Sequence, residues 1–184
     1  MANSAFVELA HVEVTSNVTA VDLPNCMSDT YMNYYVVASN VTLNGDGGFT
    51  ITGKVSNTAK SANECNYAGR VSDMGSVMQR AITSTYSGPL PHIMIQRNYN
   101  FQSGLTGNRA ILEGYLFNVR SSSHNKYAIF NSMHGTSNTS DRFWRYRMQS
   151  EDDSTNVYDG LYCATLGASH FTGGKFTVFG IRQS

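Results

Sequence analysis

Charged side chains are scarce in this chain of 184 residues, of which they make up 14%, against roughly 25% in an average globular protein. Acidic and basic residues number 13 each, so the formal net charge is zero. Without a basic excess, the chain has no long-range attraction for nucleic acid or for an anionic membrane. We therefore expect neither partner. The low charge also leaves identical copies free to assemble, because they repel one another weakly.

Long apolar runs are also missing. No run approaches the ~18 residues that a membrane-spanning helix needs. The N-terminal stretch MANSAFVELA lacks the basic start of a secretory signal peptide and carries Glu8 within its apolar part. We expect a protein that is made in the cytoplasm, is not exported by a general secretion route and does not insert into a membrane.

Cysteine is rare and shows no paired pattern. Cys26, Cys65 and Cys163 are odd in number and form no C-x-x-C motif. Thiols of this kind in a protein made in a reducing cytoplasm are typically buried and free. The sequence therefore predicts buried free thiols instead of a structural disulfide.

Motifs of catalysis and metal binding are absent. The histidines never stand in the H-x-H or H-E-x-x-H spacing of metal sites, and the stretch EDDSTNVYD lacks the alternating ligands and the turn glycine of an EF-hand loop. No G-x-S-x-G, P-loop or G-x-G-x-x-G sequence occurs. We expect a protein that is not an enzyme and that holds no metal and no cofactor. A metal site whose ligands come from distant parts of the sequence and are brought together only by the fold remains an open alternative.

What the sequence does contain is alternation with period two. The stretch YMNYYVVASNVTL places Tyr35, Val37 and Val41 on one face and Tyr34 and Val36 on the other. Its β-branched and aromatic residues suit a half-buried strand. The residues NGDGG then permit a turn, and FTITGKV follows with renewed alternation. The pattern predicts a hairpin between these two strands.

The rest of the chain reads in the same way. AILEGYLFNV, the polar turn RSSSHN and KYAIFNSM predict a second hairpin. Helical spacing is found only in GSVMQRAI (75–82), which predicts one or two helical turns. Further strands are expected at 5–14, 92–97, 142–149, 157–165 and 174–182. Short strands at even spacing, without a linker or a repeat, predict one domain over residues 1–184, an all-β antiparallel sandwich or barrel.

The stretch DRFWRYRMQ (141–149) is a candidate contact surface. As a strand it places Phe143, Arg145 and Arg147 on one face, opposite Trp144. One interpretation is a face on which arginines and an aromatic ring bind sugar or nucleic acid. The other, which we favour, puts the Trp144 face in the core and the arginines against neighbouring strands or a partner subunit.

Aromatic residues elsewhere provide further candidate contacts. Tyr99 and Phe101 lie in 98–108, which with 56–66 and 135–141 forms the set of Asn-, Ser- and Gly-rich loops. Loops on a rigid sandwich are the usual place for recognition. In the last strand, Phe176 and Val178 are expected in the core. Phe179 interrupts the polar residues on the opposite side of this strand and is expected to cover a neighbouring strand or subunit.

The order of these segments resembles the jelly-roll structural proteins of tailed bacteriophages. The segments that carry the resemblance are AFVELAHVEVTSNVTAVDLPN, YMNYYVVASNVTL, FTITGKV, NYAGR and the closing LYCATLGASHFTGGKFTVFGIRQS. In that family a Y-x-N-Y strand opens the sheet, and a G-x-F/I-x-L/V-Y/F-G-I strand closes the chain. The resemblance extends from about Phe6 to Arg182.

The resemblance implies a jelly roll of about eight strands that assembles as a homotrimer on the virion. It implies capsid decoration, tail or baseplate accessory, or fibre-tip function, with capsid or tail proteins as partners and no catalytic residues to carry over. Almost nothing precedes the first strand, which favours a decoration or cement protein over a fibre tip with its long shaft. The alternative is a receptor-binding module that recognises host surface glycan or protein.

Overall fold

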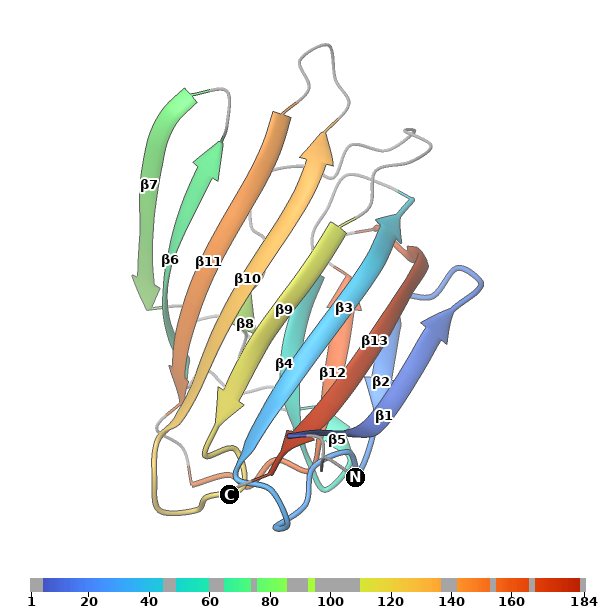
Figure 1. The fold of residues 1–184 in the computed structure, drawn as a ribbon, viewed down its shortest axis with the longest axis vertical. Helices are drawn as coiled ribbons and strands as arrows, with labels where there is room; N and C mark the ends of the chain where they lie inside the picture. Colours follow the sequence, from blue (N-terminus) through green and yellow to red (C-terminus); the bar gives the residue numbers. More distant parts are fainter. Residues whose placement is uncertain are drawn as a thin grey trace.

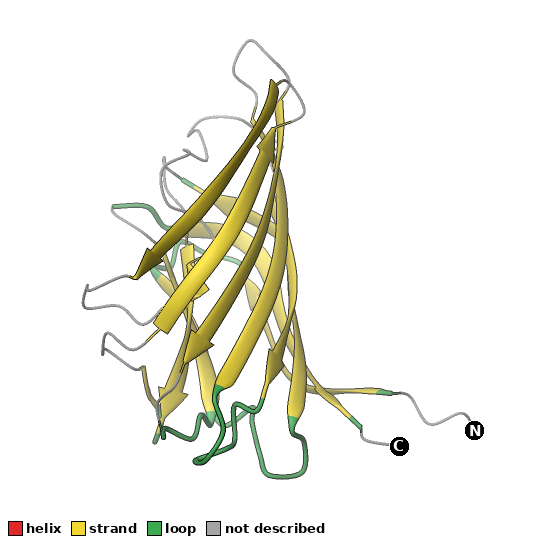
Figure 2. Ribbon diagram, turned by 90° about the vertical axis from the view of Figure 1, so that its left-hand side faces the viewer, coloured by secondary structure: helices red, strands yellow, loops and turns green. Residues whose placement is uncertain are grey.

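The computed structural model describes residues 5–44, 49–59, 65–73, 76–85, 93–94, 110–136, 142–152, 155–165 and 168–182. Within these ranges all regular secondary structure is β-strand, and it forms two antiparallel sheets that face each other (Figures 1 and 2). The expected class, an all-β antiparallel sandwich, is therefore confirmed. Side chains are described for the same ranges except 65–94, 134–136, 142–146 and 148.

The larger sheet has eight strands, in the order β1-β13-β3-β9-β10-β11-β6-β7. Its strands, in that order, are Phe6–Val14, Phe171–Ile181, Asn33–Leu43, Ala110–Phe117, Lys126–Thr136, Arg142–Asp152, Cys65–Asp73 and Ser76–Thr85. The smaller sheet has the order β2-β12-β4-β5, and β8 also pairs with β4. Its strands are Ala20–Leu23, Gly160–Thr165, Phe49–Val55, Thr58–Ala59 and Ile93–Met94.

Eight of the strands are connected as a jelly roll. Along the chain, β1, β3, β9 and β13 lie in the larger sheet and β2, β4, β8 and β12 in the smaller one, so that the chain crosses between sheets at almost every step. The resulting neighbours, β1-β13-β3-β9 and β2-β12-β4-β8, are those of the double Greek key that defines this fold. The connectivity is thus that of the expected jelly roll.

Two further hairpins enlarge one sheet only. β6 and β7 follow β4 in the chain, β10 and β11 follow β9, and both pairs add to the β9 side of the larger sheet, where β11 pairs with β6. Figure 1 shows the described strands of the smaller sheet behind β1 to β10, while β11, β6 and β7 continue the larger sheet beyond them. The molecule therefore presents one broad sheet surface to solvent.

The core lies between the sheets and is rich in aromatic rings. Phe49 from the smaller sheet meets Phe171 and Phe176 from the larger one, with ring centroids 5.5 and 6.2 Å apart. All three are at most 1% exposed. Burial of such large side chains supplies most of the stabilisation of a two-layer fold. Phe176 and Val178 are both in this core, as the sequence predicts.

The prediction of a hairpin between residues 33–43 and 49–55 is wrong. β3 pairs with β13 and β9 in the larger sheet, whereas β4 pairs with β12, β5 and β8 in the smaller one. Both strands bury apolar rows against each other across the core. A glycine-rich turn after a strand serves a hairpin and a crossing between sheets equally well, so the local pattern does not distinguish the two.

The assignment of faces in β3 is correct only as far as Ala38. Tyr34, Val36 and Ala38 are buried, and the buried row then continues at Val41 instead of Asn40. Asn40 has a φ of 54°, and the pairing with β9 shifts between Ala38 and Val41. An extra residue in a strand exchanges its two faces, so Val41 belongs to the core and not to the face of Tyr35.

The second hairpin is confirmed, and the helix is not. β9 and β10 pair directly, with Phe117 opposite Tyr127. Residues 76–85 form β7, which pairs with β6 along most of its length. Apolar residues at helical spacing can also lie on the two sides of a strand, and here the sheet edge offered by β6 provides the backbone partners that decide the structure.

The last strand runs inside the larger sheet, between β1 and β3. Gly173 and Gly174 lie within β13, at two irregularities of its pairing with β3, and do not turn the chain back; Gly174 adopts a φ of 139° there. Glycine adopts this backbone conformation more readily than other residues do.

Candidate functional site

The solvent side of the larger sheet carries a cluster of aromatic rings. We call this side the outer face; it is the face to which Tyr35, Tyr115 and Phe179 belong. These three residues are direct cross-strand partners on β3, β9 and β13. The ring centroid of Tyr35 lies 4.9 Å from that of Tyr115 and 6.2 Å from that of Phe179. Phe6 on β1 joins them, 5.4 Å from Tyr35.

The cluster continues across the sheet beyond these strands. Phe117 stacks on Tyr115 at 6.2 Å and pairs in register with Tyr127 on β10. Tyr115 itself pairs with Ile129. Cross-strand neighbours on one face lie close enough for aromatic and β-branched side chains to stabilise each other. The rings thus hold one another in place on the outer face.

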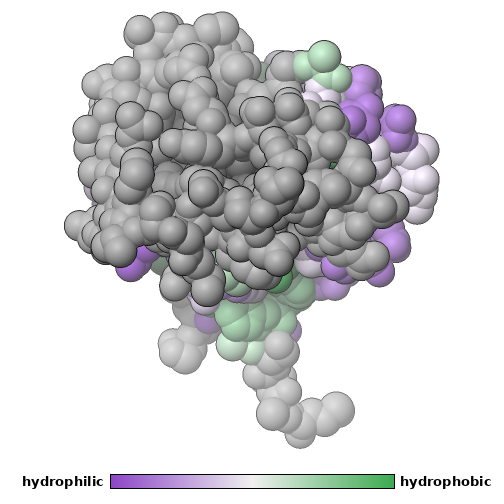
Figure 3. Space-filling view, turned by 90° about the horizontal axis from the view of Figure 1, so that it is seen from above, coloured by the Kyte–Doolittle hydropathy of each residue, from purple (hydrophilic) through white to green (hydrophobic). Residues whose placement is uncertain are grey.

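Large apolar side chains on this face remain accessible to solvent. Among the described side chains of this face, those with at least 40% of their surface exposed are Phe6, Ile111, Tyr115, Tyr127 and Met133. Ile111 and Met133 are again opposite each other in register. Apolar residues scattered singly over a surface need no explanation, but a contiguous apolar patch is typical of an interaction site. Seen from above, hydrophobic surface also gathers at the lower edge of the molecule (Figure 3).

Charged groups border the aromatic cluster. Tyr35 donates a hydrogen bond of 2.8 Å to Oε2 of Glu113. Burial, the hydrogen bond to Glu113 and the charge of that carboxylate together raise the pKa of Tyr35 to about 12. Glu113 stands in one cross-strand row with Asn131 and Arg147. The row therefore carries a negative charge on β9 and a positive charge on β11.

The structure bears on two of the six predicted contact residues. Phe179 is half-buried on the outer face and covers Tyr35 and Phe6, with ring centroids 6.2 and 6.3 Å away. Arg147 is exposed on the same face, four strands away from β13. The sequence treated these residues as separate candidates, and the fold places them on one surface.

The other four candidates are not described in full. Phe143 and Arg145 lie in β11, opposite Gly135 and Met133 of β10, but their side chains are outside the described part of the chain. Tyr99 and Phe101, with the whole loop 98–108, fall outside the described residues. So do residues 60–64 of the loop 56–66 and residues 137–141 of the loop 135–141.

The residues that the sequence reasoning missed are Phe6, Tyr115, Phe117 and Tyr127. A signal for them exists in AILEGYLF, where large apolar residues occupy both faces of one strand. Alternation alone identified a half-buried strand there. Only the strand order shows that the second set of apolar residues faces solvent, together with Phe6 and Phe179 from the two ends of the chain.

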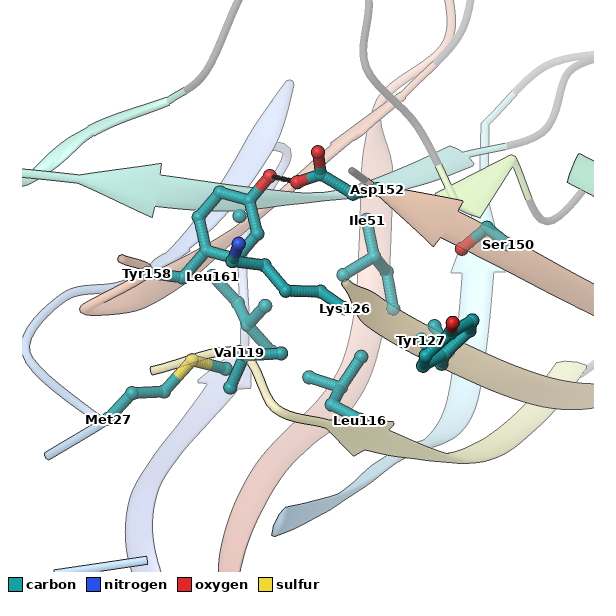
Figure 4. A pocket seen from close by; sticks show the side chains of 12 residues that line it. Met27, Ile51, Leu116, Val119, Lys126, Tyr127, Ser150, Asp152, Tyr158 and Leu161 are labelled. Atoms are coloured by element: carbon teal, nitrogen blue, oxygen red, sulfur yellow. Dashed lines mark hydrogen bonds between the residues drawn. The ribbon is translucent and has the colours of Figure 1, made fainter. Parts of the chain in front are cut away.

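A pocket between the sheets is a second candidate (Figure 4). Its cavity volume is about 40 Å³, and its lining includes the polar side chains of Lys126, Ser150, Asp152 and Tyr158. Tyr158 donates a hydrogen bond to Oδ2 of Asp152, and Lys126 Nζ lies 5.7 Å from the centre of the Tyr158 ring. Lys126 and Asp152 face each other in register at the base of the β10–β11 hairpin.

The polar groups of Tyr158, Asp152 and Lys126 interact with one another inside the pocket. The Tyr158 ring also rests against Gly53 of β4, where an added Cβ would lie 2.5 Å from the ring. Buried polar groups that satisfy each other fix the packing of the segments that carry them. The network joins the base of β10 and β11 to the smaller sheet, and we assign it a structural role.

The cysteine thiols and the arrangement of possible metal ligands also bear on the chemistry of the chain. Cys26 and Cys163 are buried and free, as expected, and burial raises the pKa of the Cys26 thiol to about 11. The Cys65 side chain lies outside the described part. Within the described ranges, no group of three or more His, Cys, Asp or Glu side chains is arranged to hold a metal ion. In the same ranges no helix is long and apolar enough to cross a membrane.

Comparison with protein-family models, with curated proteins and with solved structures found no match for this chain. The functional argument therefore rests on the fold and on the surface just described.

Proposed function

We propose that this chain is a non-enzymatic structural protein of a bacteriophage virion, a trimeric decoration or cement protein of the capsid. The observation that carries the proposal is the eight-strand jelly-roll connectivity combined with an exposed aromatic face. Jelly rolls are common in viral capsid proteins and in lectins. The same fold serves many functions, so the surface has to indicate which applies.

The character of the outer face supports a binding function over a catalytic one. A broad sheet surface with exposed rings offers a large contact area at low cost in side-chain entropy, which suits protein–protein contact. Small-molecule sites are instead concave. On a virion, several copies held together would combine weak individual contacts with the shell into firm attachment.

The second candidate is a receptor-binding module of a tail fibre or baseplate that recognises host surface glycan. Exposed Tyr115 and Tyr127 favour it, because aromatic rings on a flat support also stack on sugar rings. Capsid attachment and host binding make opposite predictions about where the protein sits on the particle.

Immunogold labelling of intact virions with an antibody raised to this chain tests both. Gold over the head is expected for a decoration protein. Gold confined to the tail end would move the receptor-binding candidate into first place. Virions that carry no gold, although the antibody detects the denatured chain in infected cells, would overturn both functions.

A further inference from the structure

We propose that the outer face is the surface through which copies of this chain bind one another, with Glu113 of one copy paired to Arg147 of the next. The inference deepens the proposed function, on which it rests for the view that the protein acts as an oligomer. It names the contact surface, the partner and one ion pair, none of which follows from the fold alone.

The first argument is the size of the surface. From β1 to β11 the outer face spans six strands, so it measures ~24 Å across the strands and ~30 Å along them, or roughly 700 Å² in plan. A stable protein–protein interface buries about 800 Å² on each partner. The face is therefore of the size that a specific contact between two folded copies requires.

The second argument is composition. The centre of the face holds Tyr35, Tyr115 and Phe179, and more exposed apolar groups, Tyr127 and Met133, lie beside it on β10. The core of a protein interface is enriched in Tyr, Phe and Met and depleted of charge. Hot-spot residues of this kind bind best where a surrounding rim excludes water. Arg147, two strands away from Tyr115, is placed to form part of such a rim, whereas Glu113 lies on β9 beside Tyr115.

The third argument is charge complementarity, which selects a second copy as the partner. Glu113 and Arg147 lie in one cross-strand row, two strands apart, and hence ~10 Å from each other. Among the described side chains no ion pair joins the two within one copy, where Glu113 accepts the hydrogen bond of Tyr35 and Arg147 is exposed. Each copy carries both charges, so the β9 side of one face complements the β11 side of another.

This arrangement also suits a closed ring. A contact between two different halves of the same face is heterologous, and it forms a ring such as a trimer when its rotation closes. In such a ring each contact uses about half of the roughly 700 Å² face. The zero net charge of the chain means that no general repulsion opposes the contact. A trimer built in this way would turn the outer faces toward its axis and leave the smaller sheets outside.

The decisive experiment is a charge exchange measured by analytical ultracentrifugation. The unmodified protein is expected to be an oligomer at micromolar concentration. Glu113→Arg and Arg147→Glu are each expected to weaken association at least ~10-fold, because each places like charges together. The double variant, Glu113→Arg with Arg147→Glu, restores opposite charges and is expected to regain most of the association. Thr58→Arg and Thr58→Glu, on β5 of the smaller sheet, are matched controls and should associate normally.

A second measurement does not depend on charge reversal. Arg147→Lys keeps the charge and supplies an amine, so a carbodiimide can join it to a carboxylate in direct contact. We expect a cross-linked peptide between Glu113 and the substituted position 147, found only in bands of two or more chains. Its absence from a cross-linked oligomer would contradict the proposed pair.

The outcomes separate the inference from the proposed function. An oligomer whose mass is unchanged in both single variants would contradict the outer face as the interface. It would not contradict the proposal of a trimeric virion protein. A dimer that the single variants dissociate would support the face and contradict the trimer. A protein that stays monomeric at high concentration would overturn self-association through this face and trimer formation together.

Discussion

The two faces of the larger sheet are built from the same strands and have opposite characters. In β9 the inner face carries Ala110, Leu112 and Leu116, all buried, whereas the outer face carries Tyr115 at 40% exposure beside Glu113. These inner side chains of β9 are aliphatic, and with the aromatic rings of neighbouring strands they form a close-packed core. The outer ones combine apolar area with polar tips, as interface residues do. Inner residues should therefore determine stability, and outer residues association.

The largest difference between the faces is expected within β13. Phe176→Ala removes a core ring that is 1% exposed and should lower the free energy of unfolding by about 3–5 kcal/mol. Phe179→Ala, on the outer face of the same strand, should lower it by about 1 kcal/mol or less. Urea unfolding followed by tryptophan fluorescence measures both. Equal losses would mean that the two faces do not differ as described.

The next largest effect concerns a close approach on the inner face. A Cβ at Gly114 would lie 2.4 Å from the Ile129 carbonyl oxygen and 2.4 Å from the Phe130 ring. Because the Ile129 backbone cannot easily move aside, Gly114→Ala should lower the free energy of unfolding by about 1–3 kcal/mol. Gly173→Ala is the matched control, since its Cβ would meet only the Thr42 hydroxyl, at 2.9 Å. A control as destabilised as Gly114→Ala would show that the cost is general to glycines in strands.

These inner-face positions also show how far the sequence alone leads. Alternation in FTVFGI is enough to place Phe176 and Val178 in the core, because period two and β-branched residues determine a strand's faces locally. The same reasoning fails at Asn40, where one extra residue exchanges the faces of β3. It fails again for β3 and β4, because a turn does not reveal which sheet the next strand joins.

The outer face shows the complementary limit. AILEGYLF reveals apolar residues on both sides of β9, but the cluster requires Phe6 and Phe179, which are brought beside Tyr35 only by the pairing of β1, β13 and β3. Such long-range pairing is a property of the jelly-roll connectivity. The resemblance to phage proteins predicted that connectivity. Alternation predicted strands at KYAIFNSM and 142–149, but it did not show that β10, β11, β6 and β7 would widen the larger sheet.

Removal of the Tyr115 ring from the outer face is expected to affect association more than stability. Tyr115→Ala removes a ring that is 40% exposed, so the free energy of unfolding measured at high dilution should fall by about 1 kcal/mol or less. Association should weaken at least ~10-fold, since interface tyrosines often dominate binding. Sedimentation at several concentrations gives both the mass and the association constant. Undiminished association would remove Tyr115 from the contact.

The smallest expected effect is a pH dependence. The pKa of Tyr35 is about 12 in the folded protein, above its ordinary value of about 10. The raised pKa means that folding favours the protonated phenol. This stabilisation is present below pH ~10 and is lost as the pH rises from ~10 toward 12. Tyr35→Phe should show less loss of stability over that interval in unfolding experiments at graded pH. Parallel curves for the two proteins would contradict the assignment.

Chemical protection of outer-face tyrosines tests the central claim most directly. Tetranitromethane treatment, followed by mass spectrometry, would be applied to the unmodified protein at dilution and at high concentration, with Tyr162 of β12 in the smaller sheet as the internal reference. We predict that Tyr115 and Tyr127 react readily when dilute and become protected on assembly, while Tyr162 reacts equally in both. Equal reactivity of Tyr115 and Tyr127 in a protein shown to be assembled would contradict the claim that the outer face is the binding surface.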